Sequence, residues 1–227
     1  MTPRVAHKTY QKTWLVTASV LAYAALVLAA DTLAMHGVRF IFDWRIFQWS
    51  TANGADLFKF VAWFVVPFVL CLPWMDWGYF GVKRWRRIDY VFLAGLAVVA
   101  VLTVLTILLF PTLRATYPSA ASLSAHAKWS FLAHNVTWTL SWLIGWEFLH
   151  RYFLLRPLAA QWPRFGWLLI PVYEGVYHLQ KPLLEAAGMV AFSLALTYWA
   201  LNRRNALLPF LAHLMVELSL IIFLVLV

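Results

Sequence analysis

Residues 89–111 read DYVFLAGLAVVAVLTVLTILLFP, an apolar run whose single charge is Asp89 at its start. Crossing the ~30 Å hydrocarbon core of a bilayer takes roughly 20 helical residues, so this run is long enough to span a membrane. The whole chain of 227 residues is 63% hydrophobic and only 12% charged. This run and the composition together predict an integral, multi-pass membrane protein.

Other segments of the chain have the same apolar character. A segment in hydrocarbon must satisfy its own backbone hydrogen bonds, and these segments lack the polar–apolar alternation of barrel strands, so we expect helices. The predicted fold class is therefore all-α, a polytopic transmembrane helical bundle forming one integral membrane domain. We predict about seven spans, within a range of six to eight, at residues 13–35, 57–75, 89–111, 128–155, 165–180, 183–201 and 206–227.

The basic residues predict how the bundle is oriented. Eighteen Lys and Arg against nine Asp and Glu give a net charge of +9, which in a soluble protein would suggest nucleic acid. Here the basic residues gather in short loops, as the positive-inside rule describes, so we expect a cytoplasmic N-terminus and no nucleic-acid partner. The expected cytoplasmic segments are the N-terminus with Arg4, Lys8 and Lys12 and the loops with Lys83, Arg84, Arg86, Arg87, Arg156, Arg164, Arg203 and Arg204. The opposite side keeps Arg39, Arg45, Arg114 and Lys181.

The acidic residues fall into two groups. The aspartates lie at predicted span ends or in loops, where we expect water to solvate them, whereas the glutamates lie within or beside the later spans. An ionised group at mid-bilayer costs at least about 2.5 kcal/mol on insertion scales, so such groups face a protein interior and have partners. The aspartates are Asp31, Asp43, Asp56, Asp76 and Asp89, and the glutamates are Glu147, Glu174, Glu185 and Glu217.

In three of the later predicted spans, a glutamate has a basic residue four positions away within the helix, which places both side chains on one face. At roughly 1.5 Å of rise per residue, Glu147, Glu174 and His213 lie about 13 to 15 Å from the expected cytoplasmic surface, near the bilayer midplane. By the same rise His178 lies about 21 Å deep, which fits if its short span is tilted or broken. The pairs are Glu147 with Arg151, Glu174 with His178, and Glu217 with His213.

Buried Glu and His side chains of this kind support two readings. A carboxylate beside apolar walls can exchange a proton with water, and a histidine can orient that water or stabilise a developing oxyanion. Alternatively, the same groups form a polar network that only holds the helices together. No G-x-S-x-G, H-E-x-x-H or cysteine cluster is present, so serine hydrolases and zincins have no motif support.

Three stretches resemble the CAAX prenyl protease and bacteriocin-processing (CPBP or ABI) family. They are WEFLHR at 146–151, YEGVYHLQKPLLE at 173–185 and HLMVE at 213–217. The three motifs of the family are EExxxR, FxxxH, and HxxxN or HxxxD. The resemblance covers roughly residues 128–227. It implies that residues 1–127 form an N-terminal transmembrane region of three spans plus an interfacial segment, and that residues 128–227 form the catalytic helical core.

The resemblance also implies roles for individual residues. Glu147 and Arg151 match the second glutamate and the arginine of the first motif, and His178 and His213 match the histidines of the other two. In the family, the glutamate pair and the second-motif histidine activate water, while the third-motif histidine and its polar partner stabilise the oxyanion. Members resemble glutamic intramembrane endopeptidases, although they are often called metalloproteases. The expected location is the inner (plasma) membrane of a bacterium.

The chain departs from the family pattern at three positions. Trp146 stands at the first glutamate, Glu174 stands at the Phe of the second motif, and Glu217 replaces the Asn or Asp of the third. Glu147 therefore inherits the role of base, with Glu174 as the other candidate. Arg151 would orient the carboxylate, and Glu185 is expected in an interfacial ion pair with Lys181, a structural role.

We therefore predict an intramembrane endopeptidase. It would cleave a membrane-associated protein or peptide with Glu147, aided by Glu174, activating water together with His178, and with His213 and Glu217 holding the oxyanion. Its partners would be the lipid bilayer and that substrate.

Two rival functions remain. One is a catalytically inactive CPBP-like membrane protein that acts in packing or partner binding, which Trp146 favours. The other is a haem or metal protein that uses His134, His178 and His213. We expect no cofactor; if a metal is bound, Glu147, His178 and His213 are its candidate ligands. His126, His134 and His150 are expected to make local hydrogen bonds instead of taking part in catalysis.

Overall fold

A computed structural model describes residues 14–35, 53–117 and 119–226, and this part of the chain is 87% helical without strands, which confirms the all-α prediction. Two elements, η1 and η5, are π-helical, and the other η elements are 3₁₀ turns. The elements are α1 (Trp14–Met35), α3 (Leu57–Lys59), η1 (Phe60–Val65), α4 (Val66–Cys71), η2 (Leu72–Trp74), η3 (Trp77–Phe80), η4 (Val82–Arg84), α5 (Arg87–Leu109), α6 (Pro111–Thr116), α7 (Ala125–Phe148), η5 (Leu149–Leu154), α8 (Leu155–Gln161), η6 (Gly166–Leu168), α9 (Leu169–Tyr177), η7 (His178–Gln180), α10 (Leu183–Arg203) and α11 (Leu207–Leu226).

The predicted spans coincide with helical segments, and five of them in the described residues are long and apolar enough to cross a membrane. The predicted span at residues 128–155, which contains most of α7, and the span at residues 165–180, which contains the short α9, are not among these five. The chain is therefore a multi-pass helical protein, while seven spans and a cytoplasmic N-terminus stay predictions. The five helices are Trp14–Leu33, Leu57–Trp74, Arg87–Leu109, Leu183–Arg203 and Leu207–Leu226.

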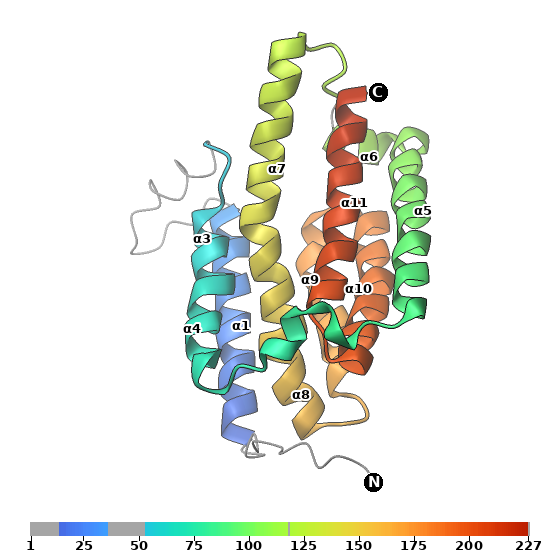
Figure 1. Ribbon diagram of the computed structural model, residues 1–227. Coiled ribbons are helices and arrows are strands. Elements are labelled where there is room, and N and C mark those ends of the chain that lie inside the picture. Colours follow the sequence, from blue (N-terminus) through green and yellow to red (C-terminus); the bar gives the residue numbers. More distant parts are fainter. Residues whose placement is uncertain (1–13, 36–52, 118, 227) are drawn as a thin grey trace.

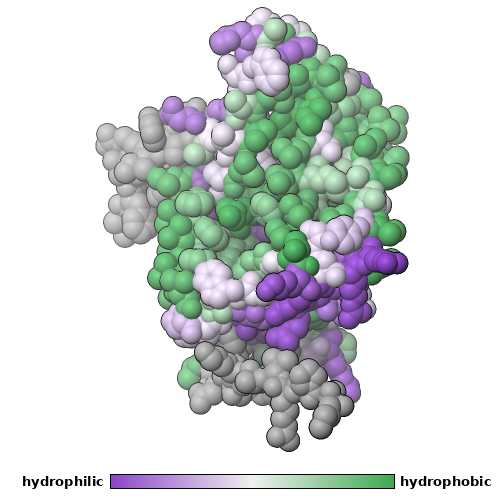
Figure 2. Space-filling view, viewed as in Figure 1, coloured by the Kyte–Doolittle hydropathy of each residue, from purple (hydrophilic) through white to green (hydrophobic). Residues whose placement is uncertain are grey.

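The outer surface of the bundle is apolar. Figure 2 shows hydrophobic residues over most of the middle of the molecule and hydrophilic residues gathered toward its lower end. On α5, Val98, Val101, Leu102 and Leu105 are all exposed. A continuous apolar surface of this size is a liability in water and suits contact with lipid. The apolar residues exposed on these helices thus fit the membrane protein that the 63% hydrophobic composition predicts.

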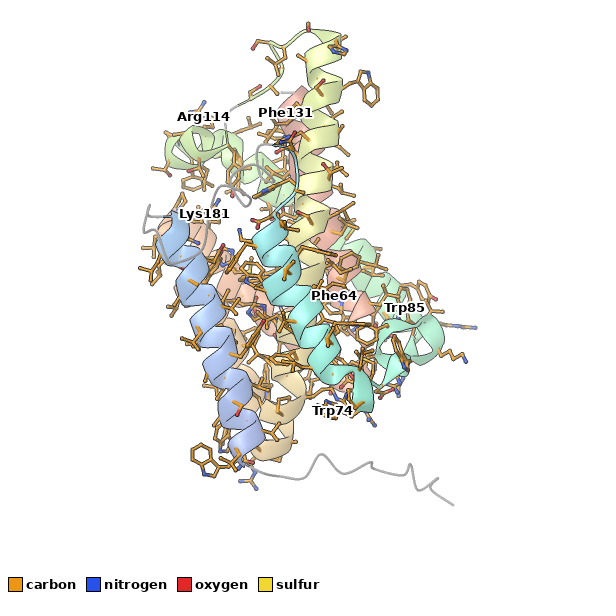
Figure 3. The ribbon with its side chains drawn as sticks, turned by 90° about the vertical axis from the view of Figure 1, so that its left-hand side faces the viewer. Phe64, Trp74, Trp85, Arg114, Phe131 and Lys181 are labelled. Atoms are coloured by element: carbon orange, nitrogen blue, oxygen red, sulfur yellow. The ribbon has the colours of Figure 1, made fainter. Side chains whose placement is uncertain are left out.

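The two ends of the bundle separate the loops as the charge pattern predicts. Figure 3 places Arg114 and Lys181 toward the upper end and Trp74 toward the lower end. Trp74 leads into the basic loop at residues 83–87, which the sequence assigns to the side opposite Arg114 and Lys181.

Helix α7 runs through the middle of the molecule and continues through η5 into α8 (Figure 1). It packs against η1 on one side and α11 on the other. Large aromatic side chains fill the space around its lower half, among them the buried Trp63, Trp146, Phe148 and Tyr152. A second core lies between α5, α10 and α11 and consists of Leu96, Leu196, Trp199, Leu208 and Ala212. The α7–η5 segment is therefore the element around which the rest is arranged.

Gly145 lets α7 approach η1 closely. A Cβ at this position would lie 2.8 Å from the Cβ of Trp63 and 3.1 Å from the carbonyl oxygen of Lys59. A backbone oxygen cannot rotate away as a flexible side chain can, so one of the two helices would have to shift. Gly145 directly precedes Trp146 and Glu147, so this spacing sets where both side chains lie.

We expect Gly145→Ala to lower the free energy of unfolding by about 1 to 3 kcal/mol, the usual cost of overpacking a core. Thermal unfolding of the purified protein in detergent measures the change. Gly95→Ala in α5 is the matched control, because no atom lies within 4 Å of its added Cβ. Equal unfolding temperatures for the two variants would contradict the close approach.

Candidate active site

Arg151 stands at the centre of a buried ion cluster. Its Nη1 and Nη2 donate to the two carboxylate oxygens of Glu174 at 2.6 and 3.1 Å, and Nη1 also donates to Thr197 Oγ1 at 2.9 Å. Its Nε lies 3.3 Å from Glu147 Oε2. The planar guanidinium is suited to such two-pronged pairing with carboxylates, which is stronger than a neutral hydrogen bond. One side chain on η5 therefore ties together α7, α9 and α10.

Glu147 also joins the cluster to α11. His213 Nδ1 lies at hydrogen-bonding distance, 2.7 Å, from Glu147 Oε1, while His213 Nε2 lies 3.8 Å from Glu217 Oε1. Glu147 and His213 are both buried, whereas Glu217 is partly exposed. Glu147 Oε2 has no hydrogen-bond partner in the described part of the chain. Glu147 therefore has one oxygen fixed by His213 and a second that lies beside Arg151 Nε without a hydrogen bond.

His178 lies beside this cluster and makes other contacts. Its Nδ1 is 2.8 Å from the carbonyl oxygen of Glu174, one helical turn earlier, and its ring meets the ring of Trp146 edge-to-face at 5.5 Å. Within the described ranges its ring forms no hydrogen bond with Glu147 or His213. Of the residues predicted for the site, the structure brings Glu147, Arg151, Glu174 and His213 into direct contact. His178 reaches them through the backbone of Glu174.

His150 belongs to the same cluster. As predicted, it makes a local hydrogen bond, because its Nδ1 is 2.8 Å from the carbonyl oxygen of Trp146. It is also fully buried, and the same nitrogen lies 3.7 Å from Glu174 Oε1. Sequence reasoning missed this second contact because His150 lies on η5, a π-helical turn. Such turns often occur at functional sites, but they carry no recognisable sequence pattern.

Glu185 takes no part in the cluster, as expected, but its partner differs from the prediction. It accepts a hydrogen bond from the Tyr117 hydroxyl at 2.8 Å, and it forms no ion pair with Lys181 in the described structure. Lys181 instead places its ammonium 5.4 Å from the centre of the Tyr117 ring. Burial, reinforced by the charge of Glu185, raises the pKa of Tyr117, so this hydroxyl stays a donor.

The prediction that water solvates every aspartate was wrong for Asp31 and Asp89. Both are buried, with relative exposures of 6% and 1%. Asp89 accepts hydrogen bonds at 2.7 Å from Arg203 Nε and from Trp199 Nε1. Neighbouring helices cover these span ends, so cations and indole groups replace water as the partners. Asp43 lies outside the described residues.

A comparison with protein families finds one that part of the second half of the chain is similar to. Residues 128–219 match the family described as type II CAAX prenyl endopeptidase Rce1-like. We call residues 128–219 the Rce1-like region. The match confirms the resemblance to the CPBP family, and it covers every residue predicted for the site. No curated protein and no solved structure matches the chain.

The Rce1-like family is a protease family, so the match supports a peptide hydrolase in the membrane. It does not name catalytic residues, and the roles given to Glu147, Glu174, His178, His213 and Glu217 remain predictions.

The residues of the Rce1-like region do not fit a metal. No group of three or more His, Cys, Asp or Glu in the described residues is placed to hold an ion. This applies to Glu147, His178 and His213, and equally to the alternative set with His134. Glu147 lies between His213 and the guanidinium of Arg151, so a dication at its carboxylate would face a buried positive charge. That no cofactor is needed stays a prediction.

Glu147 lines an apolar cavity of about 280 Å³. The other walls come from apolar and aromatic side chains, including Phe64 of η1, which Figure 3 labels, Phe148 and Phe210. A second cavity of about 460 Å³ lies along α7 and shares Ile144 and Phe210 with the first. Among the residues that the structure describes, Glu147 is the only charged one in the wall of the first cavity. The Rce1-like region thus has an acidic residue in the wall of an apolar cavity.

Proposed function

We propose that the chain is an intramembrane endopeptidase that hydrolyses a peptide bond in a membrane-associated protein or peptide, with Glu147 as the base that activates water. The observation that carries this proposal is the position of Glu147, which belongs both to the buried cluster and to the wall of the apolar cavity. An apolar residue of the substrate in this cavity would bring its peptide bond close to the carboxylate. We place the protein in the inner (plasma) membrane of a bacterium, as the resemblance implies.

Contacts distinguish Glu147 from Glu174, the other candidate base. Both oxygens of Glu174 are held by Arg151, the side chain is fully buried, and it does not line the cavity. A carboxylate in a two-pronged pair with a guanidinium is stabilised in its charged form and has little reason to take a proton. We assign Glu174 the task of fixing Arg151, which then orients Glu147.

The proposed reaction uses the two oxygens of Glu147 differently. Oε1 is held by His213, and Oε2 takes a proton from the water that attacks the substrate carbonyl, then returns that proton to the leaving amine. His213 Nε2 lies 3.8 Å from Glu217, which is too far for a hydrogen bond. In the doubly protonated imidazolium, Nδ1–H donates to Glu147 Oε1 and Nε2–H is left to donate to the developing oxyanion. His178, across Trp146, is proposed to orient the water.

A non-catalytic role in partner binding is the second candidate, and Trp146 is the observation that favours it. The first glutamate of the family motif is absent, and the Trp146 side chain is buried among aromatic rings instead of lining the cavity. In that case the cluster would only hold the helices together.

Cleavage by the reconstituted protein tests the proposal. The purified chain in liposomes is mixed with membrane-anchored peptides of varied sequence, and mass spectrometry identifies new termini. We expect cleavage beside apolar residues, at the same rate before and after treatment with a metal chelator, because the Glu147 carboxylate is occupied by Arg151 and His213. Empty liposomes are the control. Folded protein that cuts no peptide would favour the non-catalytic role, and loss of cleavage on chelation would restore the metal hypothesis.

A further inference from the structure

A second buried ion cluster lies in the first half of the chain. Lys59 Nζ is 3.2 Å from Asp56 Oδ2 and 3.8 Å from Asp31 Oδ2, and the three side chains are only 8 to 13% exposed. The ammonium also lies 5.2 Å from the centre of the Trp63 ring. Burying such charges among spanning helices is costly and usually accompanies a function. None of these residues belongs to the proposed catalytic group.

Tyr177 connects this cluster to the candidate active site. Its hydroxyl donates a hydrogen bond to Asp31 Oδ2. Its ring packs against Trp146 at a centroid distance of 5.2 Å and against the edge of Trp63 at 6.0 Å. Tyr177 is the last residue of α9, so the next residue along the chain is His178.

His178 depends on its neighbours for its orientation. It begins the 3₁₀ turn η7, where the regular hydrogen bonds of α9 end. The rings of Trp146 and Tyr177 each lie 5.5 Å from its own ring, on two sides. Edge-to-face contacts of this kind favour one relative orientation of the rings. These two rings, together with the hydrogen bond of Nδ1 with the Glu174 carbonyl, therefore set the direction of the His178 imidazole.

We propose that Tyr177, anchored by Asp31 and Lys59, is a positioning residue that holds the imidazole of His178 against Trp146. Figures 1 and 3 show α1 beside α3 and α4, the segments that carry this anchor. The first helices of the chain would thereby help to position a residue of the site. Trp146 provides an aromatic ring for His178 to pack against, which a glutamate at this position would not. The inference rests on the proposed function in so far as His178 acts in peptide hydrolysis.

Tyr177→Phe tests the anchor while keeping the aromatic ring. We expect kcat to fall by about 10- to 100-fold, the range that a small misplacement of a catalytic group costs, with KM within about twofold of wild type. The measurement uses the fastest-cleaved peptide of the liposome assay. Tyr23→Phe is the matched control, because Tyr23 donates a hydrogen bond at 2.5 Å from α1 to the Ala62 carbonyl of η1 and does not contact His178. Equal losses of kcat in both variants would overturn the proposal.

Asp31→Asn provides a second route to the same contact. It keeps the size of the side chain and an oxygen that can accept from Tyr177, but it removes the negative charge that strengthens this hydrogen bond and pairs with Lys59. If both residues act through one contact, the double variant with Tyr177→Phe has the kcat of the worse single variant. Additive losses would show that Asp31 and Tyr177 act separately, which the proposal forbids.

NMR of the full protein, ¹⁵N-labelled at histidine and held in nanodiscs, tests the positioning without any substrate. The His178 signals are assigned by their loss in His178→Gln. We expect them to shift in Tyr177→Phe and Asp31→Asn and to stay unchanged in Tyr23→Phe. Unchanged His178 signals in Tyr177→Phe would refute the positioning whatever the activity. If the signals shift but the protein cleaves no peptide, the proposal that Tyr177 positions His178 stands and only the proposed peptidase function is refuted.

Discussion

Glu147→Gln is expected to lower the rate of peptide cleavage by about 100- to 10,000-fold, the range that a general base contributes. Glutamine has nearly the shape of glutamate, so it can still fill its place between His213 and Arg151. An amide oxygen cannot take a proton from water, however. The variant therefore removes the proposed chemistry and keeps the volume of the side chain.

Rates in liposomes and thermal unfolding in detergent are measured on the same preparations. Glu185→Gln is the matched control, because Glu185 pairs with Tyr117 away from the cluster, and it should cleave at the wild-type rate. Glu174→Gln should chiefly lower stability, since Arg151 loses its two-pronged partner. A folded Glu147→Gln protein that cleaves as fast as wild type would remove Glu147 from the mechanism.

Arg151→Met is expected to lower the free energy of unfolding by about 3 to 5 kcal/mol, the usual cost of removing one partner from a buried ion pair. Arg151 is fully buried, and it is the cation that contacts both Glu147 and Glu174. Methionine fills much of the same space but leaves both carboxylates without a positive neighbour. Thermal unfolding in detergent, followed by circular dichroism, measures the loss.

Two further variants make this test specific. Arg84→Met removes a partly exposed arginine from its pair with Asp76 and should cost less than about 1 kcal/mol. Arg151→Met combined with Glu174→Leu should regain part of the lost stability, because one unpaired buried charge is removed as well. If Arg151→Met unfolds at the wild-type temperature, Arg151 does not hold the cluster together.

Features that depend on neighbouring residues in one helix were predictable from the sequence. The helical segments follow from the lengths of the apolar runs, and Glu147 with Arg151 follows from their spacing of four. Depth along the helices also predicted that Glu147, Glu174 and His213 would lie at one level. It could not predict that Arg151 would take both oxygens of Glu174, because that contact depends on how two helices rotate about their axes.

The first half of the chain was less predictable. Asp31 lies close to a predicted span end, and Lys59 looks like a loop cation at the start of a span. Each has an ordinary solvated interpretation on its own, and only the packing of α1 against α3 makes them partners. His150 was likewise assigned a local role, because nothing in the sequence marks the π-helical turn that carries it.

The two ion clusters share one feature, and the indole of Trp146 contacts residues on the side of each. Each sets one cation against two carboxylates, Arg151 in one and Lys59 in the other. The indole of Trp146 meets Trp63 and Tyr177 toward the Lys59 cluster and His150 toward the Arg151 cluster. An apolar indole therefore stands between two groups of buried carboxylates. A glutamate, which the family motif has at this position, would add a fifth carboxylate between the two clusters. Tryptophan at position 146 keeps that further negative charge out of the core.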